Sequence, residues 1–199
     1  MKKVISLLSL CAVVLLVSFT TTNNKKLIVI DAGHGGHDHG ASFNELYEKD
    51  IVEQIAKKIF EKNDPSTVEL VLLRDTDNFL SLTDRVNKIN ELNPDLVISL
   101  HINSNTMEKN TSGVEAYVSE KNSNHKIAKE QAEKLVNAIA NDKLQSRGVK
   151  QANFTILKKS NAPSVSLELG FLSNENDRAY ITSEEGQNEI AESIVKSIQ

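Results

Sequence analysis

The chain of 199 residues has a single cysteine, Cys11, which lies in an apolar segment close to the N-terminus. A disulfide scaffold needs paired cysteines, and thiol catalysis needs a cysteine inside the folded domain. Without its N-terminal segment the chain would have neither. Leu8–Cys11 faintly resembles a bacterial lipoprotein signal, but Leu10 is bulky where a small residue is expected, and the apolar run continues beyond the cysteine. We therefore do not expect lipid anchoring.

Basic residues are also scarce, since 23 Lys and Arg stand against 27 Asp and Glu and the formal net charge is −4. The long Lys/Arg-rich stripe of a nucleic-acid-binding protein is missing, so nucleic acid is not an expected partner. No apolar run after the N-terminal segment is long enough to cross a membrane. No internal repeat, low-complexity tract or Pro/Gly-rich linker interrupts residues 26–199. A single domain is the simplest organisation for a chain of this length.

The N-terminus has the order of a secretory signal peptide. Lys2 and Lys3 give a positive start, Val4–Val17 is almost wholly apolar, and Ser18–Thr22 supplies small residues for cleavage. The apolar stretch is short for a bilayer span and long for a core strand, which is the alternative interpretation. We expect residues 1–22 to be a signal peptide and residues 26–199 to be the folded domain. The protein would then be exported to the periplasm or cell envelope.

Short apolar runs alternate with amphipathic segments along the remaining chain. Six runs are predicted to be strands: Lys26–Asp31, Val68–Leu73, Asp95–His101, Gly113–Val118, Phe154–Leu157 and Ser164–Leu169. Helical periodicity predicts four helices: Tyr47–Lys62, Ser81–Leu92, Ile127–Ala140 and a last helix that begins near Thr182. Apolar strands separated by helices are typical of a largely parallel sheet with helices on both faces. The predicted fold class is therefore α/β, with a twisted, mostly parallel sheet of about six strands in one domain.

In an open α/β sheet, ligands bind beyond the carboxyl ends of the strands. His34 follows the first predicted strand, His101 ends the third, and Glu168 stands near the end of the last. These three polar side chains come from distant parts of the sequence, and each follows a run that would otherwise be core. We expect them to meet at one edge of the sheet.

Glu48 precedes the apolar stripe of the helix predicted at 47–62 by three to seven residues, which places its carboxylate on the buried face. An unpaired buried charge is costly, so a cation is an economical partner. Imidazoles and a carboxylate are ligands of catalytic zinc, which keeps one coordination position open for water. The glycines around His34 would let the backbone turn sharply near an ion. A phosphate-binding loop is less suitable, because the Lys and Ser/Thr of a P-loop are missing.

Each candidate also has a purely structural alternative. His34 could serve the turn, His101 could be a hydrogen-bonded residue at a strand end, and Glu48 could complement the helix dipole. Glu168 could pair with an arginine such as Arg74 or Arg85. His37 and His39 follow the turn in a polar loop and are expected to be solvated or to lie beside the site.

Five blocks, in order, resemble the zinc-dependent N-acetylmuramoyl-L-alanine amidases of bacterial cell walls (amidase type 3), from about Lys26 to the C-terminus. They are "IVIDAGHGG" (28–36), "EKDI" (48–51), "RDTD" (74–77), "SLHINS" (99–104) and "RGVKQANFTILKKSNAPSVSLELGFLSN" (147–174). The resemblance implies that His34, Glu48 and His101 hold one zinc ion and that Glu168 is the catalytic carboxylate. Asp31 would either orient a ligand imidazole or serve the turn.

The activity implied by the resemblance is hydrolysis of peptidoglycan or muropeptides. The bond cut is the amide between the lactyl group of N-acetylmuramic acid and the L-alanine of the stem peptide. Two alternatives stay open: a non-catalytic peptidoglycan-binding module on the same fold, and a zinc peptidase acting elsewhere in the stem peptide.

The loop Ser119–Lys126 bears on how such an enzyme would be regulated. Some relatives carry a long insertion at this position, with a helix that blocks the zinc. The loop is too short here for such a helix. No wall-binding repeat follows the domain, so an unidentified targeting partner is expected.

Overall fold

The computed structural model describes residues 25–199. The predicted signal peptide, residues 1–22, lies outside the described residues, and so does Cys11. Within residues 25–199, no helix combines the length and the hydrophobicity needed to cross a membrane.

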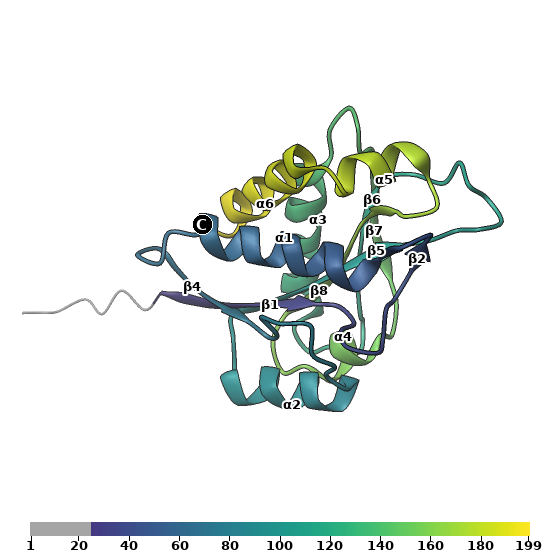
Figure 1. The fold of residues 1–199 in the computed structure, drawn as a ribbon. Coiled ribbons are helices and arrows are strands. Elements are labelled where there is room, and N and C mark those ends of the chain that lie inside the picture. The colour runs from purple at the N-terminus through teal and green to yellow at the C-terminus, as the bar shows by residue number, and fades with distance from the viewer. Residues whose placement is uncertain (1–24) are drawn as a thin grey trace, which may run out of the picture.

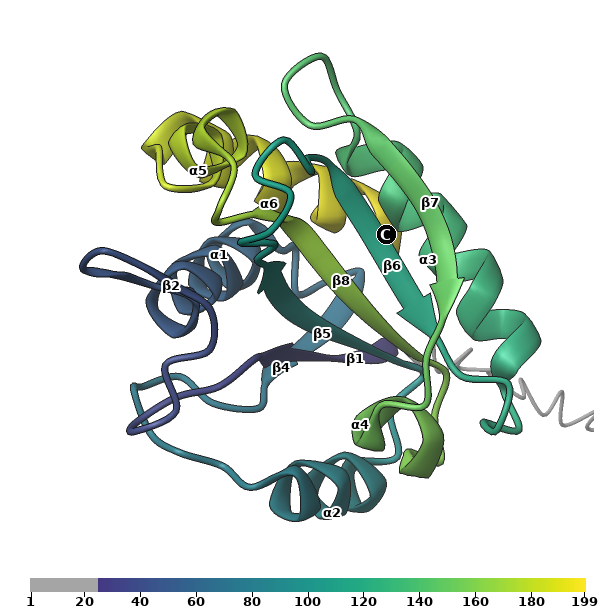
Figure 2. The ribbon, with the colours of Figure 1, turned by 90° about the vertical axis from the view of Figure 1, so that its right-hand side faces the viewer.

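A twisted sheet of six strands forms the centre of the molecule (Figures 1 and 2). Across the sheet the strands run in the order β4-β1-β5-β8-β6-β7. All neighbours are parallel except β6 and β8, which are antiparallel. The strands are β1 (Lys26–Ala32), β4 (Val68–Leu72), β5 (Leu96–Asn103), β6 (Val114–Val118), β7 (Ser146–Gln151) and β8 (Ser164–Phe171), and β2 (Ser42–Phe43) and β3 (Leu46–Tyr47) form a separate small hairpin.

Helices cover both faces of the sheet, which confirms the predicted α/β class. One face packs against α1 (Glu48–Lys62), α3 (His125–Ile139) and α6 (Glu184–Ile198). The opposite face carries α2 (Leu82–Leu92) and the short α4 (Thr155–Lys159), while α5 (Glu175–Ile181) connects β8 to α6 (Figures 1 and 2).

Four details of the prediction need correction. The predicted strand Phe154–Leu157 is instead the start of α4, because a short apolar run does not distinguish a strand from a single buried helical turn. Strand β7 was missed, since this edge strand is polar and partly exposed and shows no apolar alternation. Helix α5 was missed as well. The last helix is capped by Ser183, whose side chain accepts a hydrogen bond from the amide of Gly186, whereas Thr182 belongs to the end of α5.

The two faces of the central strands differ in chemistry. On β8, Leu167 and Leu169 point into the main core, while Ser166 and Glu168 line a cleft on the other face. On β5, Ser99 and His101 line the same cleft. Along this second face the apolar cover from α2 and α4 therefore gives way to polar side chains toward the carboxyl end of the parallel strands. This polar end of the sheet is where the candidate site lies.

Asp177 on α5 ties three segments together at the upper edge of the sheet. Its Oδ2 accepts hydrogen bonds from the amides of Gly113 and Phe171, both at 2.9 Å, and its Oδ1 accepts from the Ser112 hydroxyl at 2.7 Å. The residue is fully buried. One carboxylate thus joins α5 to the start of β6 and the end of β8.

We predict that Asp177→Ala lowers the free energy of unfolding by about 2–4 kcal/mol, because two buried amides lose their acceptor. Asp177→Asn keeps one oxygen acceptor and should lose less. The neighbouring exposed residue Asn176 provides the control, and Asn176→Ala should stay within about 0.5 kcal/mol of the wild type. Urea denaturation measures all three variants. Equal stability of Asp177→Ala and Asn176→Ala would show that this connection contributes little.

Candidate active site

Two glycines make room for the candidate site at the end of β1. A Cβ atom on Gly33 would lie 2.4 Å from Cε1 of His101, so only glycine lets the turn approach β5 this closely. A Cβ atom on Gly40 would lie 2.4 Å from Oε2 of Glu48. The glycine-rich segment therefore brings the loop that carries His34 against both α1 and β5.

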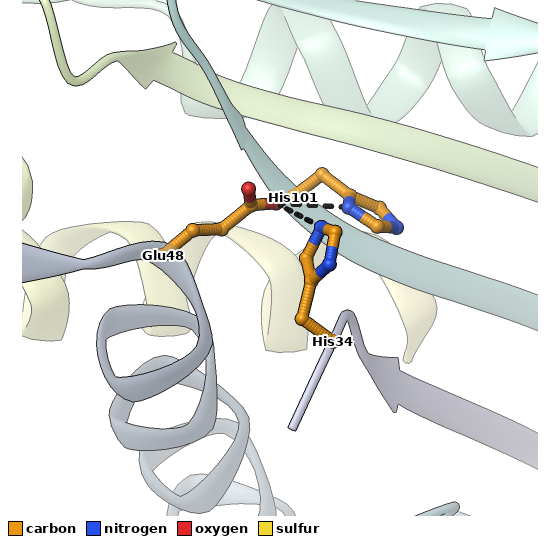
Figure 3. A group of neighbouring side chains, drawn as sticks. All are labelled: His34, Glu48 and His101. Carbon is orange, nitrogen blue, oxygen red and sulfur yellow. Dashed lines mark hydrogen bonds and ion pairs between the residues drawn. The ribbon is translucent and has the colours of Figure 1, made fainter. Parts of the chain in front are cut away.

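His34, Glu48 and His101 form one cluster, although they come from the turn after β1, the start of α1 and the strand β5 (Figure 3). Oε1 of Glu48 lies 3.2 Å from Nε2 of His34 and 2.9 Å from Nδ1 of His101. One donor atom from each residue lies within 4.8 Å of the other two. Glu48 is only 3% exposed, and its carboxylate also accepts hydrogen bonds from the amides of Ala41 and Ile102.

The other nitrogen of each imidazole has its own partner. Nδ1 of His34 lies 2.9 Å from Oδ2 of Asp38, which can only accept a hydrogen bond, so this nitrogen donates. Nε2 of His101 lies 3.2 Å from Oγ of Ser99, whose hydroxyl donates to Oδ2 of Asp31 at 2.8 Å. Nε2 of His101 is therefore also a donor. In the neutral form of each ring, the lone pair would therefore be on Nε2 of His34 and on Nδ1 of His101, the two atoms that face Glu48 and that donate to it when the rings are protonated.

The electrostatics of the cluster are those of a cation site. Burial alone would raise the pKa of Glu48, but the hydrogen bonds from His101 and His34 outweigh it, and the pKa lies well below its ordinary value. Burial lowers the pKa of His34, yet Glu48 and Asp38 raise it overall to about 9. The pKa of His101 is also raised, by Glu48, against its burial. A buried carboxylate thus attracts positive charge to this point.

This donor set fits a divalent metal ion. Two imidazole nitrogens and one carboxylate oxygen, close enough to share one ion, are the ligands of a three-residue zinc centre. Ligand imidazoles of such centres usually donate their second N–H to a carboxylate or another oxygen, as both rings do here. His34, Glu48 and His101 could therefore hold a metal ion.

Arg85 holds the backbone of the turn after β1 through hydrogen bonds. Its guanidinium donates to the carboxylate of Asp31, to the carbonyl of Ala32 at 2.9 Å and to the carbonyl of His34. The guanidinium is almost fully buried. Arg85 thus positions the chain at His34, and through Asp31 and Ser99 it also supports the ring of His101.

Arg74 joins the same turn to α1. Its guanidinium donates to the carbonyls of Gly33 at 3.0 Å and Lys49 at 2.9 Å, and it pairs with Glu53 at 2.6 Å. Both arginines therefore bind partners other than Glu168. The alternative prediction, an ion pair between Glu168 and Arg74 or Arg85, is therefore wrong.

Glu168 is the register neighbour of His101, across the β5–β8 pair. It lines a cleft of about 470 Å³ together with His34, His101, Ser99 and Ser166. Among the described residues, none donates a hydrogen bond to Oε2 of Glu168, although this atom is buried. Burial raises the pKa of Glu168 to about 7. Such a carboxyl can accept and release a proton near neutral pH.

The remaining histidines of the loop lie apart from the cluster. His37 is exposed and stacks on Phe79 at 4.2 Å, and His39 is exposed and stacks on Tyr47 at 4.4 Å. Sequence reasoning did not identify Asp38, which lies four residues after His34 and bonds to its ring. It also did not identify Ser99, which connects Asp31 to His101. The spacing of His34 and Asp38 was the one available signal.

Comparisons with known proteins define the family. The model of the N-acetylmuramoyl-L-alanine amidase family (Amidase_3) matches residues 28–199. The uncharacterized protein YqiI of Bacillus subtilis is 36% identical over 87% of this chain and 83% of its own length. The amidase LytC of B. subtilis is 38% identical over 77% of this chain, which spans 31% of LytC.

A solved structure agrees with these relatives. The crystal structure of an N-acetylmuramoyl-L-alanine amidase from Clostridium difficile 630 superposes with a TM-score of 0.81 at 31% identity, covering 88% of this chain and 95% of that one. The site and fold thus define a hydrolase of the amidase class. The chain belongs to the N-acetylmuramoyl-L-alanine amidase family, as its sequence blocks predicted.

We predict that the purified protein binds about one divalent metal ion per chain, as a single three-ligand site requires. His101→Ala should remove most of the bound metal, because it takes away one of the three donors. His37→Ala is the matched control, since it removes an exposed imidazole a few residues from the site. Elemental analysis after dialysis measures the metal content. Full occupancy in His101→Ala would exclude His101 as a ligand.

Proposed function

We propose that this protein is a zinc-dependent N-acetylmuramoyl-L-alanine amidase that acts on peptidoglycan. The bond cleaved is the amide between the lactyl group of N-acetylmuramic acid and the L-alanine of the stem peptide. One observation carries the proposal: two of the three clustered metal-type donors, His34 and His101, line the same cleft as a carboxyl with an unpartnered buried oxygen, in a chain of this family.

His34, Glu48 and His101 would hold the zinc ion. When bound, zinc supplies Lewis acidity, which lowers the pKa of water and polarises a carbonyl group. The side chain of Glu168 accepts the proton of the attacking water and then passes it to the nitrogen of the leaving L-alanine. Its position beside His101 and its raised pKa suit both transfers. Asp38, and Asp31 through Ser99, keep the two imidazoles in the tautomers that the site needs.

The cleft also has an apolar side that excludes water from the substrate. Phe154, Ile156 and Leu82 line it on the side of α4 and α2. Phe154 and Leu82 are about half exposed, 47% and 54%, so apolar surface is presented to a ligand. These residues would contact the substrate next to the scissile amide.

We further propose that residues 1–22 direct export and that the enzyme acts in the cell envelope. Peptidoglycan is located there, which suits the substrate of the family. A targeting partner that concentrates the enzyme on the wall remains part of the proposal.

Replacing Glu168 tests the division of labour within the site. Glu168→Gln keeps the size and polarity of the side chain but removes the base, so turnover should fall by roughly 10²-fold or more while the metal stays bound. Glu133→Gln, an exposed change on α3, should leave turnover unchanged. Activity is measured on purified muropeptides together with the metal content. Near-normal turnover in the metal-loaded Glu168→Gln protein would contradict a role as base.

Product analysis separates the proposal from its alternatives. Amidase action releases an intact stem peptide with a free L-alanine amino terminus, and mass spectrometry identifies that peptide. A zinc peptidase would release shorter fragments. A non-catalytic module would bind sacculi and release nothing, even when loaded with metal.

The connection between β6 and α3 generates a prediction about regulation. It comprises residues 119–124 only, too few for a blocking helix with its linkers. The purified protein should therefore cleave soluble muropeptides without a second protein, because no conformational opening has to precede binding. Hydrolysis assays with the protein alone measure this. Silence on soluble muropeptides that ends when another protein is added would contradict the prediction.

A further inference from the structure

A buried carboxylate with two cations lies next to Glu168 in the sheet. Glu115 on β6 is the register partner of Glu168 and is 1% exposed. The same oxygen, Oε2, accepts from Nε of Arg147 at 2.6 Å and from Nζ of Lys150 at 2.5 Å, while Oε1 accepts from the hydroxyl of Tyr117 at 2.7 Å. Two positive charges therefore share one negative charge.

This excess of positive charge is built into the fold. The register between β6 and β7 shifts between Val114 and Ala116, so that the segment containing Arg147 and Gly148 bulges opposite Glu115. Gly148 lies in this bulge with a φ of 76°, a backbone conformation that glycine adopts more readily than other residues. The chain as a whole is acidic, with a formal charge of −4. The pair of cations at Glu115 is thus a local concentration of positive charge in an acidic chain.

The cations border the cleft rather than the main core. The ring of Tyr117 lies 5.3 Å from that of Phe154, which lines the cleft, and Nζ of Lys150 lies 5.9 Å from the centre of the Tyr117 ring. The side chain of Lys150 is 40% exposed and that of Arg147 is 33% exposed. Lys150 is thus directed at Glu115 and is also accessible to a ligand, whereas the guanidinium of Arg147 additionally donates to the carbonyl of Ser112 at 3.2 Å and lies over the ring of Phe171.

The sheet also sets the order of these groups. The candidate metal ligand His101 lies on β5, Glu168 on β8, Glu115 on β6 and the two cations on β7. Neighbouring strands lie about 4.8 Å apart, so the ammonium of Lys150, held at Glu115, lies roughly one strand spacing beyond Glu168. If the scissile amide lies at Glu168 and the stem peptide runs toward β7, the atoms that follow the amide nitrogen come close to Lys150.

We propose that Lys150, supported by Arg147, binds the α-carboxylate of the second residue of the stem peptide. This inference rests on the proposed amidase function. That residue is a D-glutamate joined onward through its γ-carboxyl, so its α-carboxyl is either a free acid or an amide. In an extended peptide this group lies about 5–7 Å from the nitrogen of the preceding L-alanine, a distance similar to one strand spacing. The charged pair would make the enzyme prefer the acid form over the amidated form.

The test compares two muropeptides that differ only at this group, one with the free α-carboxylate and one with the amide. We expect the wild type to show a kcat/KM about tenfold or more higher for the acid form, the scale of one charge-assisted hydrogen bond. Lys150→Met should abolish the preference through a loss on the acid form alone. Lys150→Arg should restore most of it, and Arg147 still neutralises Glu115 in both variants.

Lys129 supplies the matched control. It is an exposed lysine on α3, which covers the opposite face of the sheet, so Lys129→Met removes the same charge from outside the cleft and should keep the preference. Binding of both muropeptides to the Glu168→Gln protein, measured by calorimetry, provides a readout that needs no turnover. The acid form should bind more tightly, and adding Lys150→Met should remove the difference.

The outcomes separate the two proposals. Turnover of both muropeptides at equal kcat/KM would overturn the carboxylate site and leave the amidase function standing. A preference that survives Lys150→Met would also overturn it. Selective binding of the acid form without hydrolysis by the wild type would support the carboxylate site and contradict the amidase function.

Discussion

The buried carboxylate of Glu48 is the group on which the architecture of the site depends. A negative charge at the start of α1, almost without exposure to solvent, is stable only if positive charge and hydrogen-bond donors surround it. The two imidazoles and the amides of Ala41 and Ile102 provide them. Because Glu48 and its donors come from three separate segments, the hydrogen bonds to this carboxylate bring the loop after β1, helix α1 and strand β5 to the same point.

Around Glu48, hydrogen bonds with neighbouring side chains orient the two imidazoles and the backbone of the turn. Asp38 fixes the ring of His34, and Ser99 and Asp31 fix the ring of His101. Arg85 binds Asp31 and the backbone of the turn, and Arg74 joins the turn to α1. The residues that surround the cluster are not candidate metal ligands themselves, but their hydrogen bonds orient the candidate ligands. They determine which nitrogen of each imidazole carries the lone pair.

The sequence was sufficient to predict the fold class and to predict that the four candidate residues lie near one another at one edge of the sheet. Strands with strong apolar character, such as β1 and β5, are recognisable because burial demands it. Strand β7 is not, because an edge strand with one half-exposed face keeps polar residues. The α4 turn was mistaken for a strand for a different reason: a short run with three apolar residues satisfies either periodicity.

The partners within the site were harder to predict than its principal residues. Glu48 can be identified from the sequence, because a carboxylate on the apolar face of a helix needs a cation or hydrogen-bond donors nearby. The bond from Ser99 to Asp31 joins residues 68 positions apart, and only the register of β1 and β5 places them side by side. The roles of Gly33 and Gly40 likewise depend on distances to His101 and Glu48, which spacing along the chain does not reveal.

The separation of the apolar interior into two clusters affects how such a protein can change over evolutionary time. Helix α1, which carries Glu48, is anchored in the larger cluster, whereas Ile156 of α4 belongs to the smaller one with Val86 and Ile89 of α2. The wall of the cleft that we propose contacts the substrate and the helix that carries Glu48 therefore pack into different apolar clusters. Substitutions beneath α4 can reshape the choice of substrate while the donors keep their places, so new specificities are accessible without rebuilding the chemistry.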